Sequence, residues 1–133
     1  PRADYDEAER LFFMQKAREK GDWAYKELRA LILHTQDNGQ DPFGVPGSIY
    51  GAIGICQFMP SNALSLGVDG DGDGAVNLFT LPDAIMSIGN YLRHHGWKGD
   101  MTNRARQREV VYAYNHSNTY VNTVLAVADA VGE

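Results

Sequence analysis

The fold of this chain is decided by the stretch Gly47-Ser48-Ile49-Tyr50-Gly51-Ala52-Ile53-Gly54-Ile55-Cys56-Gln57-Phe58-Met59-Pro60-Ser61. Three of its first eight residues are glycines, and a glycine inside a helix costs about 0.5–1 kcal/mol relative to alanine. The run, called the glycine-rich loop below, therefore predicts a buried turn whose backbone approaches another helix or a ligand closely. Pro60 is expected to end this turn, and Ser61 to cap the helix that follows.

The composition is that of an ordinary globular protein. The 133 residues are 44% hydrophobic and 22% charged, which predicts a single domain over residues 1–133. The net charge of −5 comes without any basic run, which argues against nucleic acid as a partner. No apolar stretch approaches the roughly 18 residues of a membrane span. The single cysteine, Cys56, excludes an internal disulfide and is interpreted as a packing residue.

Two helices are expected before the glycine-rich loop. The first covers residues 4–20, with Asp4 as its cap and Gly21 as its end, and the second begins at Asp22. Helical spacing predicts its buried face as Leu28, Leu31, Ile32 and Thr35. Two aromatic residues, Trp23 and Tyr25, are expected to be its packing anchors. A loop rich in turn formers then spans residues 37–47.

The remaining helices are predicted from caps and apolar spacing. One short helix should run from Ser61 to Leu66, and a longer one should begin with Pro82 at its first position and end at Gly96. Asn103 is expected to cap a helix that ends near Tyr114, and Ser117 or Asn118 to cap the last. The expected buried face of the longer helix is Ile85, Ile88, Leu92 and His95. No alternating strand or repeat is evident, so the predicted fold class is all-α.

Residues 69–83 carry a calcium-loop pattern. Such a loop needs oxygen ligands at positions 1, 3 and 5, a glycine at position 6 and a backbone carbonyl at position 7. The sequence offers Asp69, Asp71, Asp73, Gly74 and Ala75 at those positions. Position 12 is Thr80 instead of the usual glutamate, and Asp83 can supply the missing carboxylate. The pattern predicts a structural Ca²⁺ site, with Na⁺ as a substitute ion when calcium is scarce.

Other readings of the acidic loop remain open. A solvated acidic turn without an ion has the same composition. Dockerin modules and calcium sensors use similar loops, but they carry two of them, whereas this chain has one inside a larger helical domain. A single loop therefore favours an EF-hand-like element that stabilises the domain.

Three blocks in order resemble the lysozyme-like domain of lytic murein transglycosylases of the membrane-bound B type. They are the glycine-rich loop, residues 83–97 and the run Tyr114-Asn115-His116-Ser117, which ends three residues later in Tyr120. The resemblance covers roughly residues 28–131. It implies a lysozyme-like helical domain whose EF-hand-like loop takes its last acidic ligand at the displaced position of Asp83.

The resemblance also implies residues that contact peptidoglycan. Ser48 and Gln57 would hydrogen-bond the sugar beside the scissile bond. Tyr91, Tyr114 and Tyr120 would form aromatic walls, and Asn115 would contact the N-acetylmuramyl unit. Sugar faces stack on aromatic rings and amides meet N-acetyl groups, so these residue types suit the task. Core packing is the alternative role for each tyrosine, and a structural or surface role is expected for His94, His95 and His116.

The catalytic glutamate of the resembling family is not recognisable here. Members use one glutamate as acid and then base, and the muramyl C6 hydroxyl attacks to give a 1,6-anhydro product. No glutamate of this chain has the expected Glu-Thr/Ser-x-x-Gly context: Glu7, Glu9, Glu19, Glu27, Glu109 and Glu133. The expectation is that the catalytic residue lies upstream of Pro1, that the domain is incomplete at its N-terminus and that this chain alone is inactive.

The sequence thus predicts part of a bacterial lytic transglycosylase that cleaves the β-1,4 bond between N-acetylmuramic acid and N-acetylglucosamine. The alternatives are a non-catalytic peptidoglycan-binding module and a calcium-stabilised structural module. The expected location is the periplasmic side of the cell envelope. Membrane attachment is expected only through an anchor outside this chain, as in a lipoprotein.

Overall fold

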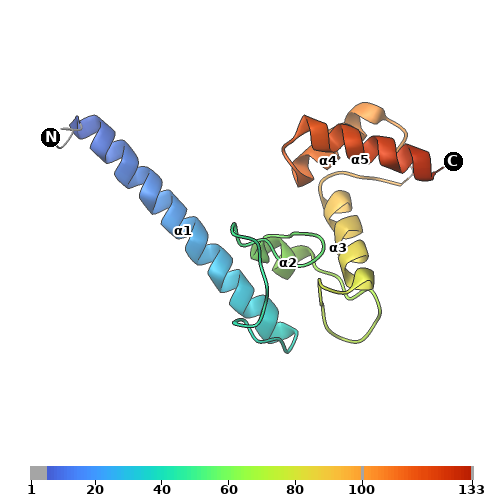
Figure 1. Cartoon of the computed structure of the whole chain (residues 1–133), viewed down its shortest axis with the longest axis horizontal. Coiled ribbons are helices and arrows are strands. Elements are labelled where there is room, and N and C mark those ends of the chain that lie inside the picture. The colour runs from blue at the N-terminus through green and yellow to red at the C-terminus, as the bar shows by residue number, and fades with distance from the viewer. Residues whose placement is uncertain (1–5, 100, 133) are drawn as a thin grey trace.

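A computed structural model describes residues 6–99 and 101–132. Within these residues the chain forms helices and two isolated β-bridges but no strand, which confirms the all-α prediction. The five helices are α1 (Glu7–Asp37), α2 (Pro60–Leu66), α3 (Leu81–His94), α4 (Arg104–Tyr114) and α5 (Asn118–Val131). The C-terminal half of α1 lies beside α2, and its N-terminal half projects away from the other helices (Figure 1). None of these helices combines the length and apolar character that a membrane span requires.

The first helix corrects the sequence prediction. It is one continuous helix of 31 residues, so Gly21 does not end it and Asp22 does not start another. A single exposed glycine costs about 1 kcal/mol, whereas a break would leave two helix ends to be capped. Asp6 caps the helix, and the predicted cap Asp4 lies outside the described residues.

The buried faces of α1 and α3 also differ from the predicted ones. On α1 every residue from 6 to 26 is exposed, so Trp23 and Tyr25 are not packing anchors. Of the predicted buried face, Thr35 is buried, but Leu28 and Ile32 are 56% and 46% exposed. The helix buries a face near its C-terminus that also includes Ala30 and His34. Of the face predicted for α3, Ile85 and His95 are exposed, and Ile88 and Leu92 are half-buried. The buried face consists of Asp83, Ala84, Ser87 and Tyr91. On α3 the buried Ser87 and Asp83 accept hydrogen bonds from backbone N–H groups of neighbouring loops. On α1 the buried Thr35 instead donates to Leu31 O and Ile32 O of its own helix.

Several predicted helix ends are confirmed. The Asn103 side chain accepts a hydrogen bond from Arg106 N, and the Ser117 hydroxyl accepts one from Tyr120 N. Gly96 follows the C-cap of α3 with a φ of 108°, a conformation that glycine adopts without strain. Ser61, however, is not a cap: α2 begins at Pro60, and the N-cap Met59 has no side-chain hydrogen bond.

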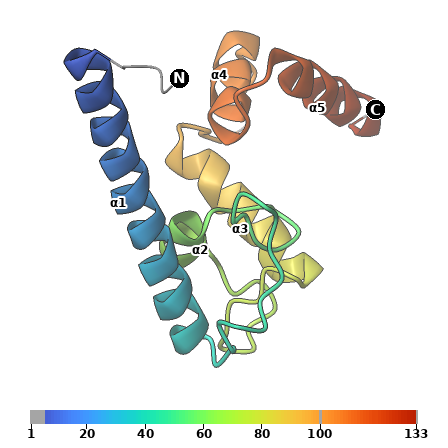
Figure 2. The same ribbon diagram turned by 60° about the vertical axis from the view of Figure 1, so that its left-hand side comes forward.

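Two apolar clusters hold the helices together. The larger one gathers residues from the glycine-rich loop, α2, the end of the acidic loop and α3: Ile53, Cys56, Phe58, Ala63, Leu78 and Tyr91. The smaller one joins α4 to α5 through Val111, Val121 and Leu125. Figure 2 shows the resulting arrangement, with α2 against α1, α3 next to α2, and the α4–α5 pair at the far end of α3.

The second half of the glycine-rich loop contains the close backbone approach that its glycines predict. In the first half the predicted burial is wrong, because Ile49 and Tyr50 are 92% and 78% exposed. Ile53 and Phe58 exchange two backbone hydrogen bonds of 2.8 and 3.1 Å, which close a tight turn. Gly54 within this turn has a φ of 71°, and a Cβ atom there would lie 2.4 Å from Leu78 Cβ. Ile55 N also donates to Leu78 O at 2.8 Å. The glycine-rich loop is thus held against Leu78, near the end of the acidic loop.

Candidate functional site

Gln57 is the most unusual residue of the glycine-rich loop. Its φ of 51° makes it the one non-glycine residue with a positive φ in the part of the chain that is described. Its backbone N–H and its side-chain Nε2 both donate to Gly54 O, at 3.1 and 2.9 Å, which holds the exposed side chain across the turn. A strained backbone that the surroundings enforce is typical of functional sites.

Ser48 shapes the first part of the same loop. Its hydroxyl oxygen accepts hydrogen bonds from Tyr50 N at 3.3 Å and from Ala52 N at 3.1 Å. The backbone N–H of Ser48 donates to Ala52 O at 2.8 Å. The hydroxyl proton is not used in these contacts, so the half-buried Ser48 can still donate a hydrogen bond to a ligand.

The three predicted tyrosines come together in one aromatic cluster, which also includes Phe58 and His95. The ring of Tyr91 lies 5.1 Å from that of Tyr114 and 5.4 Å from that of Phe58. The rings of Tyr114 and Tyr120 are parallel within 4°, with centroids 6.3 Å apart. His95, for which a structural or surface role was expected, stacks on Tyr91 at 4.0 Å.

The two inner tyrosines direct their hydroxyl groups into the protein. Tyr91, which is only 7% exposed, donates to Ala113 O at 2.8 Å. Tyr114 donates to Cys56 O, and burial, with smaller contributions from Cys56, Tyr120 and Tyr91, raises the pKa of its phenol well above the ordinary value. Both hydroxyl groups therefore act as structural donors. Tyr91 fits the core role that the sequence left open, while Tyr114 and Tyr120 are half-buried and keep accessible ring surface.

The remaining members of the candidate site lie close to this cluster in the sequence. Asn115 is exposed at the C-cap of α4, directly after Tyr114. Cys56 is buried, and its burial raises the pKa of the thiol, in keeping with a packing role. The site therefore combines exposed amides with a partly covered aromatic surface, a combination suited to a carbohydrate.

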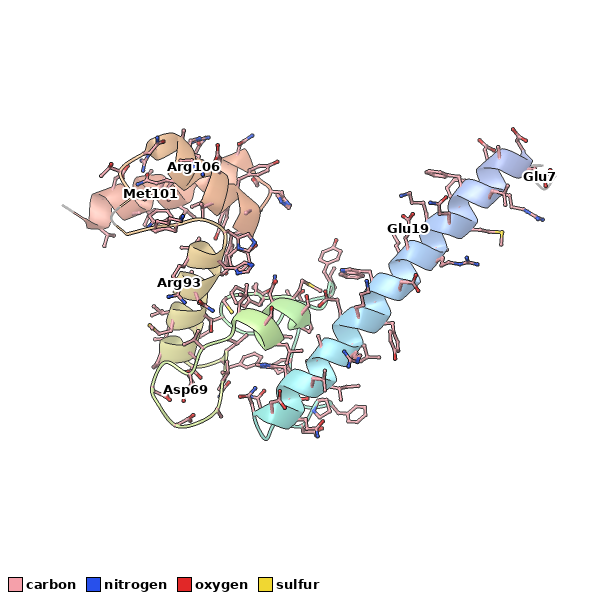
Figure 3. The ribbon with its side chains drawn as sticks, turned by 180° about the vertical axis from the view of Figure 1, so that it is seen from behind. Glu7, Glu19, Asp69, Arg93, Met101 and Arg106 are labelled. Carbon is pink, nitrogen blue, oxygen red and sulfur yellow. The ribbon has the colours of Figure 1, made fainter. Side chains whose placement is uncertain are left out.

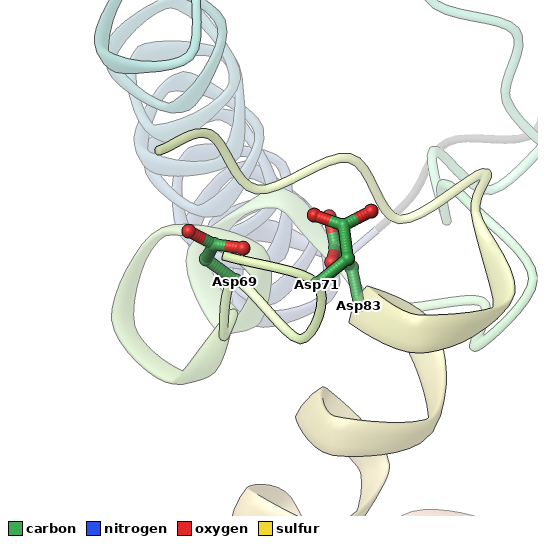
Figure 4. Close-up of side chains that lie close together, drawn as sticks. All are labelled: Asp69, Asp71 and Asp83. Atoms are coloured by element: carbon green, nitrogen blue, oxygen red, sulfur yellow. The ribbon is translucent and has the colours of Figure 1, made fainter. Parts of the chain in front are cut away.

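The acidic loop brings three of the predicted metal ligands together. One carboxylate oxygen from each of Asp69, Asp71 and Asp83 lies within 4.8 Å of the others (Figure 4). This group does not include Asp73, whose Oδ1 accepts from Ala75 N at 2.8 Å. Hydrogen bonds from Gly74 N and Gly72 N hold the pKa of Asp69 below its usual range, which keeps this carboxylate charged. Hard cations such as Ca²⁺ prefer such oxygen ligands, so the donor set fits calcium.

Asp83 has a structural task besides its place in this group. It is 1% exposed, and its two carboxylate oxygens accept from Gly70 N at 2.8 Å and from Asn77 N at 2.6 Å. A Cβ atom at Gly70 would lie 2.3 Å from Pro82 O, so the loop approaches α3 as closely as glycine permits. Asp83 thereby fastens both halves of the acidic loop to the start of α3.

The described glutamates occupy structural or remote positions. Glu7 and Glu19 lie on the part of α1 that projects away from the other helices (Figure 3), and Glu9 shares the first turn with Glu7. Glu109 pairs with Arg106 at 2.7 Å on the surface of α4. Glu27 accepts hydrogen bonds from Ser61 N at 2.9 Å and from Ser61 Oγ at 2.8 Å. Sequence reasoning missed this last contact, because it joins residues 34 positions apart and has no local signal.

Comparisons with known proteins agree with this architecture. The family model described as "Transglycosylase SLT domain" matches residues 4–109. Membrane-bound lytic murein transglycosylase B of Escherichia coli (strain K12) is 47% identical over 75 residues, which are 56% of this chain and 21% of that protein. The chain thus spans about a fifth of the curated relative that it matches.

Solved structures of lytic transglycosylases share the fold. The Escherichia coli lytic transglycosylase Slt35 in complex with calcium has a TM-score of 0.76 and 26% identity, over 86% of this chain and 55% of that one. Soluble lytic transglycosylase SltB1 of Pseudomonas aeruginosa has a TM-score of 0.75 and 27% identity, over 86% of this chain and 60% of that one. The helical fold, the order of the motifs and the match over most of its length together establish that this chain belongs to the Transglycosylase SLT domain family.

Proposed function

We propose that this chain is the glycan-holding part of a lytic transglycosylase that acts on peptidoglycan, with formation of 1,6-anhydromuramyl ends. The observation that carries the proposal is the strained, exposed Gln57 on a loop that packs against the aromatic cluster. A bulgecin A complex of the related Slt35, with 26% identity, supports a ligand site in this fold. The expected setting is the periplasmic side of the cell envelope, with any membrane anchor outside residues 1–133.

The proposed roles follow from the exposed groups. Gln57 and Asn115 would bind the N-acetyl and hydroxyl groups of the sugar, and Ser48 would donate its free hydroxyl proton. Tyr114 and Tyr120 would offer ring surface to the sugar face, with Tyr91 supporting them from the core. This arrangement would fix the muramyl unit so that its C6 hydroxyl reaches the anomeric carbon.

The bond-breaking step needs an acid. A carboxylic acid protonates the leaving oxygen; the same group then takes the proton of the C6 hydroxyl as O6 bonds to C1, which closes the anhydro ring. We assign this group to residues outside this chain, because Glu27 is bound to Ser61 and the other described glutamates are exposed on α1 and α4. Residues 1–133 would then hold the glycan without cleaving it.

Binding to purified murein tests the proposal. The chain should co-sediment with sacculi. Gln57→Ala should weaken that binding by about tenfold, because the polar group of the bound sugar would lose the hydrogen bond that Gln57 makes to it. Gln36→Ala, an exposed glutamine on α1, is the matched control. Absence of binding by the unaltered chain would refute the glycan site. Release of 1,6-anhydromuropeptides by residues 1–133, detected by mass spectrometry, would refute the assignment of the acid.

We also propose that the acidic loop holds a structural Ca²⁺ ion through Asp69, Asp71 and Asp83, with Asp73 and the Ala75 carbonyl completing the site. Support comes from the clustered carboxylates and from the calcium complex of Slt35. Calcium at about 100 times its dissociation constant should stabilise the fold by about 2.7 kcal/mol. Asp71→Ala should abolish most of this gain, and Asp41→Ala, an exposed aspartate outside the loop, should not. A melting temperature that responds to neither calcium nor chelator would exclude the site. If sodium can take the place of calcium, Na⁺ alone should also raise the melting temperature.

A further inference from the structure

We propose that Glu27 is a positioning residue of the glycan site, which it orients by fastening the start of α2 to α1. The proposal rests on the function proposed for the glycine-rich loop. Both hydrogen bonds that Glu27 accepts from the glycine-rich loop come from Ser61, at its last position, so we infer that its effect on Gln57 passes through α2 and the apolar cluster.

The start of α2 lacks a local cap. Met59 occupies the N-cap position and makes no side-chain hydrogen bond, and Pro60 has no backbone N–H. Ser61 N is thus the first free donor of the helix, and it is satisfied by the carboxylate of Glu27 at 2.9 Å. The Ser61 hydroxyl donates to the other carboxylate oxygen at 2.8 Å. A carboxylate at this end of a helix also interacts favourably with the helix dipole.

The contact is placed where it can orient the glycine-rich loop. Leu31, one turn after Glu27 on the same face of α1, packs against the apolar cluster that contains Ile53, Phe58 and Ala63. Ala63 belongs to α2, and Ile53 and Phe58 close the turn that carries Gln57. The two α1 residues therefore hold α2 and the cluster at two points, and this fixes the direction of the turn.

The strained backbone of Gln57 makes such support necessary. A non-glycine residue with φ near 50° persists only where its surroundings enforce that conformation. The local enforcement consists of the Ile53–Phe58 bonds and the two bonds to Gly54 O. Loss of the Glu27 contact would free the segment that follows Phe58 and let this turn relax.

Amide hydrogen exchange of the labelled chain tests the proposal without any glycan. Glu27→Ala should speed the exchange of the Ile53 and Phe58 amides by about tenfold relative to Val121 in α5. Glu27→Gln should stay close to the unaltered chain, because its amide can accept from Ser61 N and donate to Ser61 Oγ. Ser61→Ala should have an intermediate effect, and Glu19→Ala, on the exposed part of α1, should have none.

Murein binding then separates this inference from the proposed function. Binding should weaken in Glu27→Ala and be retained in Glu27→Gln. Equal acceleration of exchange in residues 53–58 and in α5 would reduce Glu27 to a general stabiliser and overturn the inference, as would unchanged murein binding in Glu27→Ala. If the unaltered chain binds no murein, the proposed function fails, while the exchange rates still decide whether Glu27 orients the turn.

Discussion

Replacement of Gly54 by alanine should destabilise the protein more than replacement of a glycine whose surroundings are open. The new Cβ atom would lie 2.4 Å from Leu78 Cβ and 2.6 Å from Leu78 O, and both atoms belong to a residue that is 1% exposed. Gly54 also has a φ of 71°, a conformation that alanine adopts at a cost of about 1–2 kcal/mol. Inserting a methyl group into a packed core adds about 1–3 kcal/mol.

The expected loss for Gly54→Ala is therefore about 2–5 kcal/mol, a large part of the roughly 5–15 kcal/mol that stabilises a typical domain. Gly39→Ala is the matched control, because Gly39 has a φ of 64° and no atom within 4 Å of the added Cβ. The control bears only the conformational cost, about 1–2 kcal/mol. The difference between the two variants isolates the contact with Leu78.

Urea denaturation followed by circular dichroism measures the loss of unfolding free energy in both variants. The free energy of unfolding should fall with urea concentration at the same slope in both, which shows that the two transitions are comparable. A Gly54→Ala variant within about 0.5 kcal/mol of the control would contradict the close approach of the glycine-rich loop to Leu78, since surface-like changes fall in that range. Such a result would also mean that position 54 has room for a Cβ atom and does not require a glycine for packing.

Three further outcomes are expected. Asp83→Ala should cost about 3–5 kcal/mol in chelator-treated protein, because it removes two hydrogen bonds to a buried carboxylate; a loss seen only with calcium present would contradict this. Burial lowers the pKa of His34 below 6.5, so the native state binds protons less readily than the unfolded chain, and the free energy of unfolding should fall as the pH drops below about 7. His34→Met should flatten that decline in denaturation curves taken between pH 7.5 and 5, and an unchanged slope would argue against the burial. Tyr114→Phe should cost about 0.5–1.5 kcal/mol through the lost bond to Cys56 O, and equilibrium unfolding that shows no loss would contradict a structural role for this hydroxyl.

Local rules predicted the parts of the fold that local chemistry decides. Asn103 and Ser117 cap helices because a short polar side chain reaches a backbone N–H two or three residues later in the chain. The residue type and this short spacing can both be read from the sequence. Gly96 ends α3 for the same kind of reason. The gathering of Asp83 with Asp69 and Asp71 could be anticipated because the loop that joins them is short.

Parts that depend on distant neighbours could not be predicted in this way. The predicted helix break at Gly21 was wrong, because helix propensity counts only the free-energy cost of the glycine. It leaves out the larger cost of capping two new helix ends. The predicted buried face of α3 was wrong because Ser87 is buried by a distant partner: its Oγ accepts a hydrogen bond from Val68 N, 19 positions away, and apolar spacing carries no signal of that bond. The partnership of Glu27 with Ser61 has no local signal, since the missing cap of α2 is supplied from another helix.

The inward direction of the Tyr91 and Tyr114 hydroxyl groups has a consequence for selectivity. Because both phenols donate to backbone carbonyls, these two rings would meet a ligand of the proposed site through carbon atoms and would discriminate poorly among sugars of similar shape. Under the proposed function, recognition of particular substituents would then fall to the exposed amides of Gln57 and Asn115. Relatives could therefore acquire a preference for differently modified glycan strands by changing one or two loop residues, while the tyrosines stay fixed by the needs of folding.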